Sequence, residues 1–298
     1  MRRSRAIHPI VGVLSSAVLV LSACSSEHPS HVAASSPSGV VWQHDPALRS
    51  AVGRYATYVD DQLDHLASAA HALDTAISAG DLTGARRAYG RARPYYERVE
   101  PVAEIWGSLD LRIDGRANDF VRPSRFVGFH RIEQLLWTSG HGAPTAATLV
   151  AARTVAADAD ANVARLRTLA RAVDYTPLEL TSGATELLDE IQASKVTGDE
   201  ERYSHIDLVD FAANVDGVRE VVQVFTPALR SRDPELLATI TTRSHQLDAG
   251  LARFRAQPGY DGTGFVRFTT VTTAQRRTLA GLVQALAESV ALLTGALT

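Results

Sequence analysis

From Pro46 to the end of the chain, apolar residues recur at spacings of three and four, which is the periodicity of amphipathic α-helices. Alanine, the strongest helix former, is abundant, and the strict alternation typical of half-buried strands is absent. The pattern predicts an all-α protein with about eight helices. We expect these helices over about residues 46–79, 82–106, 124–138, 145–173, 178–196, 206–230, 234–256 and 273–297, with the second one interrupted or bent near Pro94 and Pro101.

Breaks in the pattern suggest how the helices are grouped. A polar loop is expected from Gly107 to Pro123, and the segment Tyr175-Thr176-Pro177 divides the helices into two sets of four. We therefore predict two packed antiparallel four-helix bundles, over about residues 45–174 and 175–298. The last helix, 273–297, is apolar on most faces and is expected to lie between its neighbours.

The N-terminal segment has the pattern of an export signal. Three arginines precede an apolar run, Ile10 to Leu21, which is shorter than the roughly 20 residues needed to span a membrane. The run ends in the lipobox pattern Leu-Ser-Ala-Cys, so we predict a lipoprotein signal peptide over residues 1–23. Residues 24–44 would form a flexible tether with a lipidated Cys24. The alternative is an ordinary cleavage site that leaves a free thiol.

Composition narrows the possible chemistry. Of the 298 residues 45% are apolar and 21% charged, as in ordinary soluble domains. Cys24 is the only cysteine, so any metal site in this chain must use histidine and carboxylates. Removing residues 1–23 takes away three arginines and no acidic residue, which changes the formal charge from −3 to −6. This balance does not favour a nucleic-acid partner.

The first of three polar clusters is acidic. Glu97, Glu100 and Glu104 share one face of a predicted helix, where each pair repels by a few tenths of a kcal/mol unless a cation or an arginine lies between them. Two interpretations follow: a solvated acidic face paired with neighbouring arginines, or a cation site.

The second cluster is a His-x-x-Glu pair. His130 and Glu133 lie three apart on a predicted helix, so their side chains converge, as in the Glu-x-x-His pairs of bundle-core metal proteins. The pair is either a metal site or a satisfied polar contact. Gln134 stands where a His-x-x-Glu-His zinc peptidase needs its second histidine, so a peptidase site lacks one ligand.

The third cluster lies in the second half of the chain. Glu186 and Glu190 are four apart, and Asp207 and Asp210 lie near a helix N-terminus, where acidic residues complement the helix dipole. The sequence contains no glycine-rich phosphate loop, no Gly-x-Ser-x-Gly motif and no catalytic cysteine, so it offers no nucleophile for covalent catalysis.

Longer segments carry a family resemblance. In the first half they are Pro-Tyr-Tyr-Glu-Arg-Val-Glu-Pro-Val-Ala-Glu at 94–104, Gly-Ser-Leu-Asp at 107–110 and Gly-Phe-His-Arg-Ile-Glu at 128–133. In the second half they are Glu-Leu-Leu-Asp-Glu at 186–190, Gly-Asp-Glu-Glu at 198–201 and Tyr-Ser-His-Ile-Asp-Leu at 203–208. Together they resemble the imelysin-like family, in particular the EfeO/EfeM-type lipoproteins of iron uptake, over nearly all of residues 45–298.

The resemblance implies a metal site in a cleft of an all-α double bundle. The implied metal ligands are Glu97, Glu100, Asp114, His130, Glu133 and Glu190, with Glu186 and Asp207 as further candidates. Arg116 and Arg131 are expected to hold these carboxylates in place. The implied cargo is iron, as Fe²⁺ or Fe³⁺, and such ligands also suit Zn²⁺, Mn²⁺ or Cu²⁺.

The same resemblance implies a role in transport. Only the tether precedes the first predicted helix, which points to the short form of the family without an N-terminal cupredoxin domain. We therefore expect a non-enzymatic protein, anchored to the membrane lipid through Cys24 on the extracytoplasmic side, at the cell surface or in the periplasm. It would deliver iron to a membrane permease. The alternatives are a metallopeptidase that uses the His-x-x-Glu motif and a surface module that binds polysaccharide.

Overall fold

A computed structural model describes residues 42–138, 145–193 and 195–298. The predicted signal peptide, Cys24 and the tether up to residue 41 lie outside these described residues. The described residues form ten α-helices joined by loops and short 3₁₀ turns, with no β-strand among them, so the all-α prediction is confirmed. All these helices belong to one compact unit.

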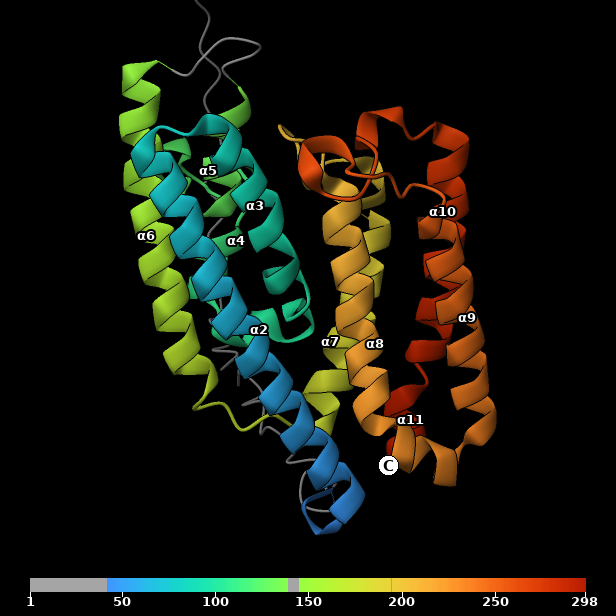
Figure 1. Ribbon diagram of the computed structural model, residues 1–298. Helices are drawn as coiled ribbons and strands as arrows, with labels where there is room; N and C mark the ends of the chain where they lie inside the picture. Colours follow the sequence, from blue (N-terminus) through green and yellow to red (C-terminus); the bar gives the residue numbers. More distant parts are fainter. Residues whose placement is uncertain (1–41, 139–144, 194) are drawn as a thin grey trace, which may run out of the picture. The chain divides into compact units, whose positions relative to one another are not determined.

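The first set of helices lies before residue 171 (Figure 1). It consists of α2 (Pro46–Ala79), α3 (Leu82–Glu97), α4 (Ser108–Asp114), α5 (Phe129–Trp137) and α6 (Ala146–Ala170), with the 3₁₀ turns η1 (Trp42–His44), η2 (Glu100–Trp106) and η3 (Pro123–Arg125). Helix α2 packs along α3 and α6, and α5 contacts both α3 and α6. The short α4 lies against α5, α6 and η2.

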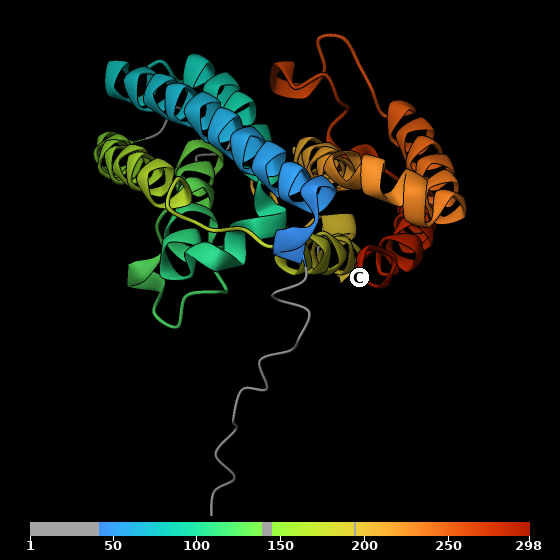
Figure 2. The same cartoon turned by 90° about the horizontal axis from the view of Figure 1, so that it is seen from below.

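The second set follows the segment at 171–176. It consists of α7 (Pro177–Ala193), α8 (Asp207–Arg232), α9 (Pro234–Ala252), α10 (Thr273–Val290) and α11 (Leu293–Leu297), with the 3₁₀ turns η4 (Lys195–Thr197), η5 (Tyr260–Gly262) and η6 (Phe268–Thr270). Helices α7 and α9 each contact α8 and α10. The two sets meet where α8 packs on α2 and α3 and where α7 packs on η2 (Figure 2). The two-bundle assignment, divided at residues 174 and 175, stays a prediction.

Local sequence signals account for the longest helix. Asp45 caps α2, because one carboxylate oxygen accepts the backbone N–H groups of Ala47 and Leu48 at 2.7 and 3.1 Å. Gly80 ends it in the left-handed conformation, with φ of 74°. The helix therefore begins and ends where the sequence predicts, at Pro46 and Ala79.

The structure subdivides two of the predicted segments. The helix expected over 82–106 is interrupted near Pro101: α3 runs past Pro94 and ends at Glu97, and residues 100–106 form the 3₁₀ turn η2. The polar loop expected at 107–123 contains α4. This helix has only seven residues and buries only Leu109 and Ile113, so its apolar periodicity is too short to stand out.

The C-terminal helix was expected to be buried between its neighbours, and it packs between α7 and α9 with one face buried. It is interrupted after Val290, and α10 buries one face, through Leu279, Val283, Leu286 and Val290, while it packs on α7 and α9. Thr273–Leu297 is, among the described residues, the one segment long and apolar enough to cross a membrane, with 39% of its most apolar window buried. Core helices of soluble proteins meet the same criterion, so this is weak evidence for a membrane span.

Candidate metal centre

The interior between α3, α5, α8 and the segment at 195–207 holds an excess of acidic groups. Among the described residues six acidic side chains are buried: Glu97, Glu133, Glu200, Glu201, Asp207 and Asp210. The buried basic groups beside them are Arg93, Lys195 and His130. Because an unpaired charge is costly to bury, this interior requires counter-charges, bound protons or a bound cation.

Gly128, at the start of α5, allows α4 and α5 to approach each other closely. Gly128 has a φ of 83°, and a Cβ atom there would lie 2.4 Å from the carbonyl oxygen of Ile113 and 2.7 Å from that of Arg112. Only glycine allows this close approach. The first turn of α5, with His130, is therefore held against the last turn of α4, with Asp114.

A second glycine shapes the segment that enters from the other set of helices. Gly198 has a φ of 90°, and a Cβ atom there would lie 2.7 Å from the ring of Phe268. The turn at Gly198 lies between Lys195 and Glu200, both of which are buried. A short segment thus supplies one cation and one carboxylate to the same interior.

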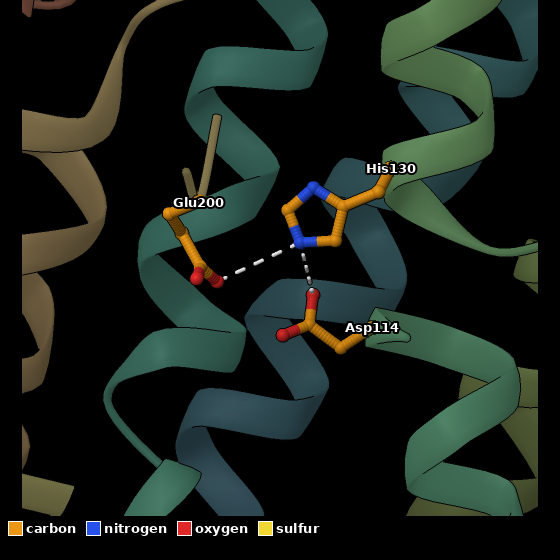
Figure 3. A group of neighbouring side chains, drawn as sticks. All are labelled: Asp114, His130 and Glu200. Carbon is orange, nitrogen blue, oxygen red and sulfur yellow. Dashed lines mark ion pairs between the residues drawn. The ribbon is translucent and has the colours of Figure 1, made fainter. Parts of the chain in front are cut away.

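His130 points its Nε2 atom at two carboxylates (Figure 3). This atom lies 3.7 Å from Asp114 Oδ1 and 3.6 Å from Glu200 Oε1. The side chain is only 2% exposed, and Nε2 makes no hydrogen bond within the described part of the chain. An imidazole nitrogen and two carboxylate oxygens that converge in this way form a potential metal-binding group.

The other ring nitrogen of His130 is held by Glu133. Nδ1 lies 3.4 Å from Glu133 Oε2. The second oxygen of Glu133 accepts the backbone N–H groups of Tyr203 and Ser204 at 2.7 and 2.6 Å, which fixes the carboxylate. A histidine that binds metal through one nitrogen usually donates its other N–H to such a carboxylate. The geometry therefore fits Glu133 as the group that orients His130.

Two other sets of three side chains also converge, but contacts within the protein already hold them. Glu97, Glu200 and Asp210 converge, but Arg93 lies among them and also contacts Asp114 and Glu201. Its guanidinium nitrogens lie 3.2 Å from Asp210 and 3.0 Å from Glu201. Glu201, which converges with His130 and Glu133, also accepts the hydroxyls of Tyr89 and Ser204. Arg93 contacts Asp114 and Glu200 as well, but only their group includes a histidine nitrogen that makes no hydrogen bond within the described part of the chain. Asp114, His130 and Glu200 are therefore the group best suited to an added cation.

Lys195 occupies a neighbouring carboxylate cage. Its Nζ lies 2.8 Å from Glu97 Oε2, 2.7 Å from Glu100 Oε2 and 3.5 Å from Glu200 Oε1. The amide of Asn214 donates to Glu97 Oε2 at 2.9 Å and also to Glu100. Glu97 and Glu100 therefore already have a cation of the protein between them.

Neighbouring charges favour the ionised forms of three side chains of the site, Glu97, Glu200 and His130. Burial opposes charge on Glu97, but Arg93 and Lys195 lower its pKa to about 2. Burial likewise opposes charge on Glu200, yet Lys195 and His130 hold its pKa well below the usual range. Burial and Arg93 disfavour the imidazolium of His130, but the surrounding carboxylates raise its pKa to about 10. In the metal-free protein His130 therefore carries a proton, which a metal ion would replace.

Burial shifts the pKa values of several other acidic groups upward. Burial raises the pKa values of Glu100, Glu201 and Asp210 well above their usual range and raises that of Asp114. Burial also raises the pKa of Asp207 to about 7. The six buried acidic side chains thus outnumber the three buried basic ones, and an added cation would find ligands there.

An acidic cavity of about 520 Å³ adjoins this interior. Its acidic lining residues are Glu100, Glu104, Asp110, Asp114, Asp119, Glu179, Glu186, Glu190 and Glu200. The one basic residue in the lining is Arg116, which donates to Glu200 Oε2 at 2.8 Å and to Glu190 Oε1 at 3.1 Å. A second cavity of about 10 Å³, roughly the size of one water molecule, is lined partly by His130, Glu133 and Glu200.

The structure separates the six predicted ligands into three places. Asp114, His130 and Glu133 come together. Glu97 and Glu100 surround Lys195 instead. Glu190 forms an ion pair with Arg116 and lines the large cavity.

The further candidates are also distributed. Glu186 lines the large cavity, whereas Asp207 accepts the backbone N–H of Glu201 at 3.1 Å. Arg116 contacts site carboxylates as expected, but Arg131 donates to the side chain of Gln134.

Sequence reasoning missed three residues of the site. Glu200 lies in the Gly-Asp-Glu-Glu segment without a helical partner, so no periodicity marks it. Arg93 precedes Glu97 by four residues, a spacing that predicts a pair but not five carboxylate contacts. Lys195 did carry a signal, because it is the only lysine in the chain.

Comparison with known proteins gives one family and several relatives. The model of the family described as imelysin, peptidase M75, matches residues 51–293. The protein named iron uptake system component EfeO of Yersinia pseudotuberculosis serotype I (strain IP32953) is 36% identical over 256 residues, which cover 84% of this chain and 65% of that protein. The protein of the same name from Escherichia coli (strain K12) is 34% identical over 254 residues, which cover 84% of this chain and 64% of that protein. The chain thus spans somewhat less than two thirds of these relatives.

Proposed function

This chain belongs to the imelysin family, and from that premise we propose that it is a metal-binding component of an iron uptake system, with iron as its cargo. The name of its relatives, iron uptake system component EfeO, supports this role. The observation that carries the proposal is the buried His130, whose Nε2 has no hydrogen bond and faces Asp114 and Glu200. Glu133 orients the ring from its other side.

The donor set fits the proposed cargo. One imidazole nitrogen and several carboxylate oxygens suit Fe²⁺ and Fe³⁺, and also Zn²⁺, Mn²⁺ or Cu²⁺, better than a soft ion such as Cu⁺. The cavity beside the site has nine acidic side chains in its lining, which would concentrate cations near Asp114 and Glu200. The same lining would repel an acidic polysaccharide, so we place cation binding ahead of the polysaccharide alternative.

We propose that this chain is not a peptidase, although its family is named as one. Metal-dependent hydrolysis needs a general base beside the metal-bound water. Both oxygens of Glu133 already have partners, and Gln134 donates to the hydroxyl of Tyr203 at 3.0 Å. Zn²⁺-loaded protein incubated with casein should show no cleavage. Chelator-sensitive cleavage that disappears in Glu133→Gln would overturn this proposal.

We also propose how the protein acts in the cell. Cys24 would anchor it to the outer face of the membrane lipid, and the folded part would pass iron to a permease of the same uptake system. The relatives' name supports membership of such a system, and the lipobox pattern supports the anchor.

Isothermal titration tests the metal site. Zn²⁺ and Mn²⁺ are suitable probes in air, and Fe²⁺ is used without oxygen. We expect one ion per chain, and we expect His130→Ala and Glu200→Gln each to weaken binding by about 100-fold, because each removes a ligand or its charge. His71→Ala is the matched control, since His71 is 73% exposed and far in sequence from the site. Equal affinity in wild type and His130→Ala, with both proteins folded by circular dichroism, would contradict the proposal.

A further inference from the structure

Lys195 is an unusual residue in this protein. It is the only lysine among 298 residues, in a chain whose other basic side chains are arginines and histidines. Its side chain is fully buried, although lysine is among the residues least often buried. A buried ammonium persists only where carboxylates repay its lost hydration, and here Glu97 and Glu100 do so at 2.8 and 2.7 Å.

The ammonium also competes for a ligand of the metal centre. Lys195 Nζ lies 3.5 Å from Glu200 Oε1, and His130 Nε2 lies 3.6 Å from the same oxygen. A cation bound between His130 and Glu200 would therefore share this oxygen with a permanent positive charge. The bound cation and the Lys195 ammonium would both lie in the protein interior, where charges interact more strongly than in water.

We propose that Lys195 determines the charge specificity of the metal centre, as a built-in counter-charge that repels bound cations in proportion to their own charge. This inference rests on the proposed function. Repulsion from one ammonium is half again as large for a trivalent as for a divalent ion at the same position. Lys195 thus shifts the site toward divalent ions and keeps a bound ion exchangeable, as a protein that passes on its cargo requires.

The test is the affinity of Lys195→Met for two redox-inert ions, Zn²⁺ and Ga³⁺, the latter supplied from a citrate buffer. If the Zn²⁺ affinity rises about 10-fold, the Ga³⁺ affinity should rise about 30-fold, because the logarithm of the gain scales with ion charge. Lys195→Arg keeps the charge and should retain the wild-type Ga³⁺/Zn²⁺ ratio. Arg219→Met is the matched control, because it removes a positive charge that is 41% exposed and pairs with Asp216 and Asp248.

The outcomes separate this inference from the proposed function. If Lys195 has only a structural role, Lys195→Met should bind both ions more weakly than wild type. That result, or an unchanged ratio of Ga³⁺ to Zn²⁺ affinity, would overturn the inference. The proposed function would still stand as long as binding in wild type depends on His130. Binding that His130→Ala leaves unchanged would instead overturn the proposed function and the inference with it.

A second measurement keeps the inference testable if Lys195→Met does not fold. Wild-type protein labelled with ¹⁵N-lysine should give a single lysine side-chain resonance, since the sequence has one lysine. We expect the ¹⁵Nζ shift of Lys195 to change on addition of Zn²⁺ and to saturate at one equivalent. A resonance that does not move at saturating Zn²⁺ would show that Lys195 does not sense the bound ion and would overturn the inference.

Discussion

At the scale of single residues, the position of His130 depends on Glu133. Its carboxylate holds the ring by Nδ1 and is itself fixed by two backbone N–H groups. Glu133→Gln keeps an oxygen for those backbone donors but loses the charge that orients the imidazole. We expect metal affinity to fall by about 10- to 100-fold, with the fold retained. Titration with Zn²⁺ measures this, and an affinity equal to that of wild type would show that Glu133 does not position the ligand.

A second prediction concerns Asp110, on the acidic cavity. Burial raises its pKa to about 6, although the hydroxyl of Tyr96 donates to it and works in the opposite direction. The folded state therefore binds this proton more tightly than the unfolded chain, so Asp110 costs stability as the pH rises from about 4 through about 6. Relative to wild type, Asp110→Asn should gain about 1–3 kcal/mol in free energy of unfolding over that range. Urea unfolding at pH 4.5, 5.5 and 7 measures the difference, which would stay constant if the pKa of Asp110 were normal.

Only the local contacts of the site follow from the sequence. His130 and Glu133 lie one helical turn apart, so their proximity is predictable from spacing. Glu97 and Lys195 are 98 residues apart, and their contact depends on how α3 packs against the second set of helices. No periodicity encodes that contact, which is why Glu97 was expected at the metal and is found beside Lys195.

At the scale of elements, the contact between α4 and α5 sets the distance between Asp114 and His130. A Cβ atom at Gly128 would meet two backbone carbonyls, and the φ of 83° is itself strained for other residues. Gly128→Ala should lower the free energy of unfolding by roughly 2 kcal/mol or more and should also weaken Zn²⁺ binding, although Gly128 touches no ligand.

Gly53→Ala is the matched control for that change. Gly53 lies inside α2 with nothing within 4 Å of a Cβ atom, so alanine there should stabilise the protein by about 0.5–1 kcal/mol through its better helix propensity. Chemical unfolding and Zn²⁺ titration of both variants make the comparison. If Gly128→Ala binds Zn²⁺ as wild type does, the close approach of α4 and α5 does not position the site.

The elements differ in how well the sequence predicts them. Helix α2 has a carboxylate cap, a first-turn proline and a terminal glycine, and both of its ends were predicted correctly. Helix α4 begins at a glycine without a side-chain cap and is too short for a recognisable period, so it was missed. Yet α4 supplies Asp114, which means that a weakly encoded element carries part of the candidate site.

At the scale of the whole molecule, the proposed anchor at Cys24 makes a direct prediction. Lipidation of the only cysteine would hold the protein in the membrane fraction, because two acyl chains or more give stable anchoring. Cys24→Ser should move the exported protein from the membrane fraction to the soluble fraction. Intact-mass measurement of wild type should show the added lipid on Cys24. Equal membrane retention of both proteins would contradict the anchor.

The central claim is that a cation binds between α4, α5 and the segment after η4, and anomalous X-ray scattering tests it most directly. Crystals soaked in Zn²⁺ should show one strong anomalous peak about 2.0–2.2 Å from His130 Nε2 and from oxygens of Asp114 and Glu200. The peak should be absent in His130→Ala crystals of the same form. A peak held by Glu97 and Glu100 without His130, or no peak in this interior at saturating Zn²⁺, would contradict the account.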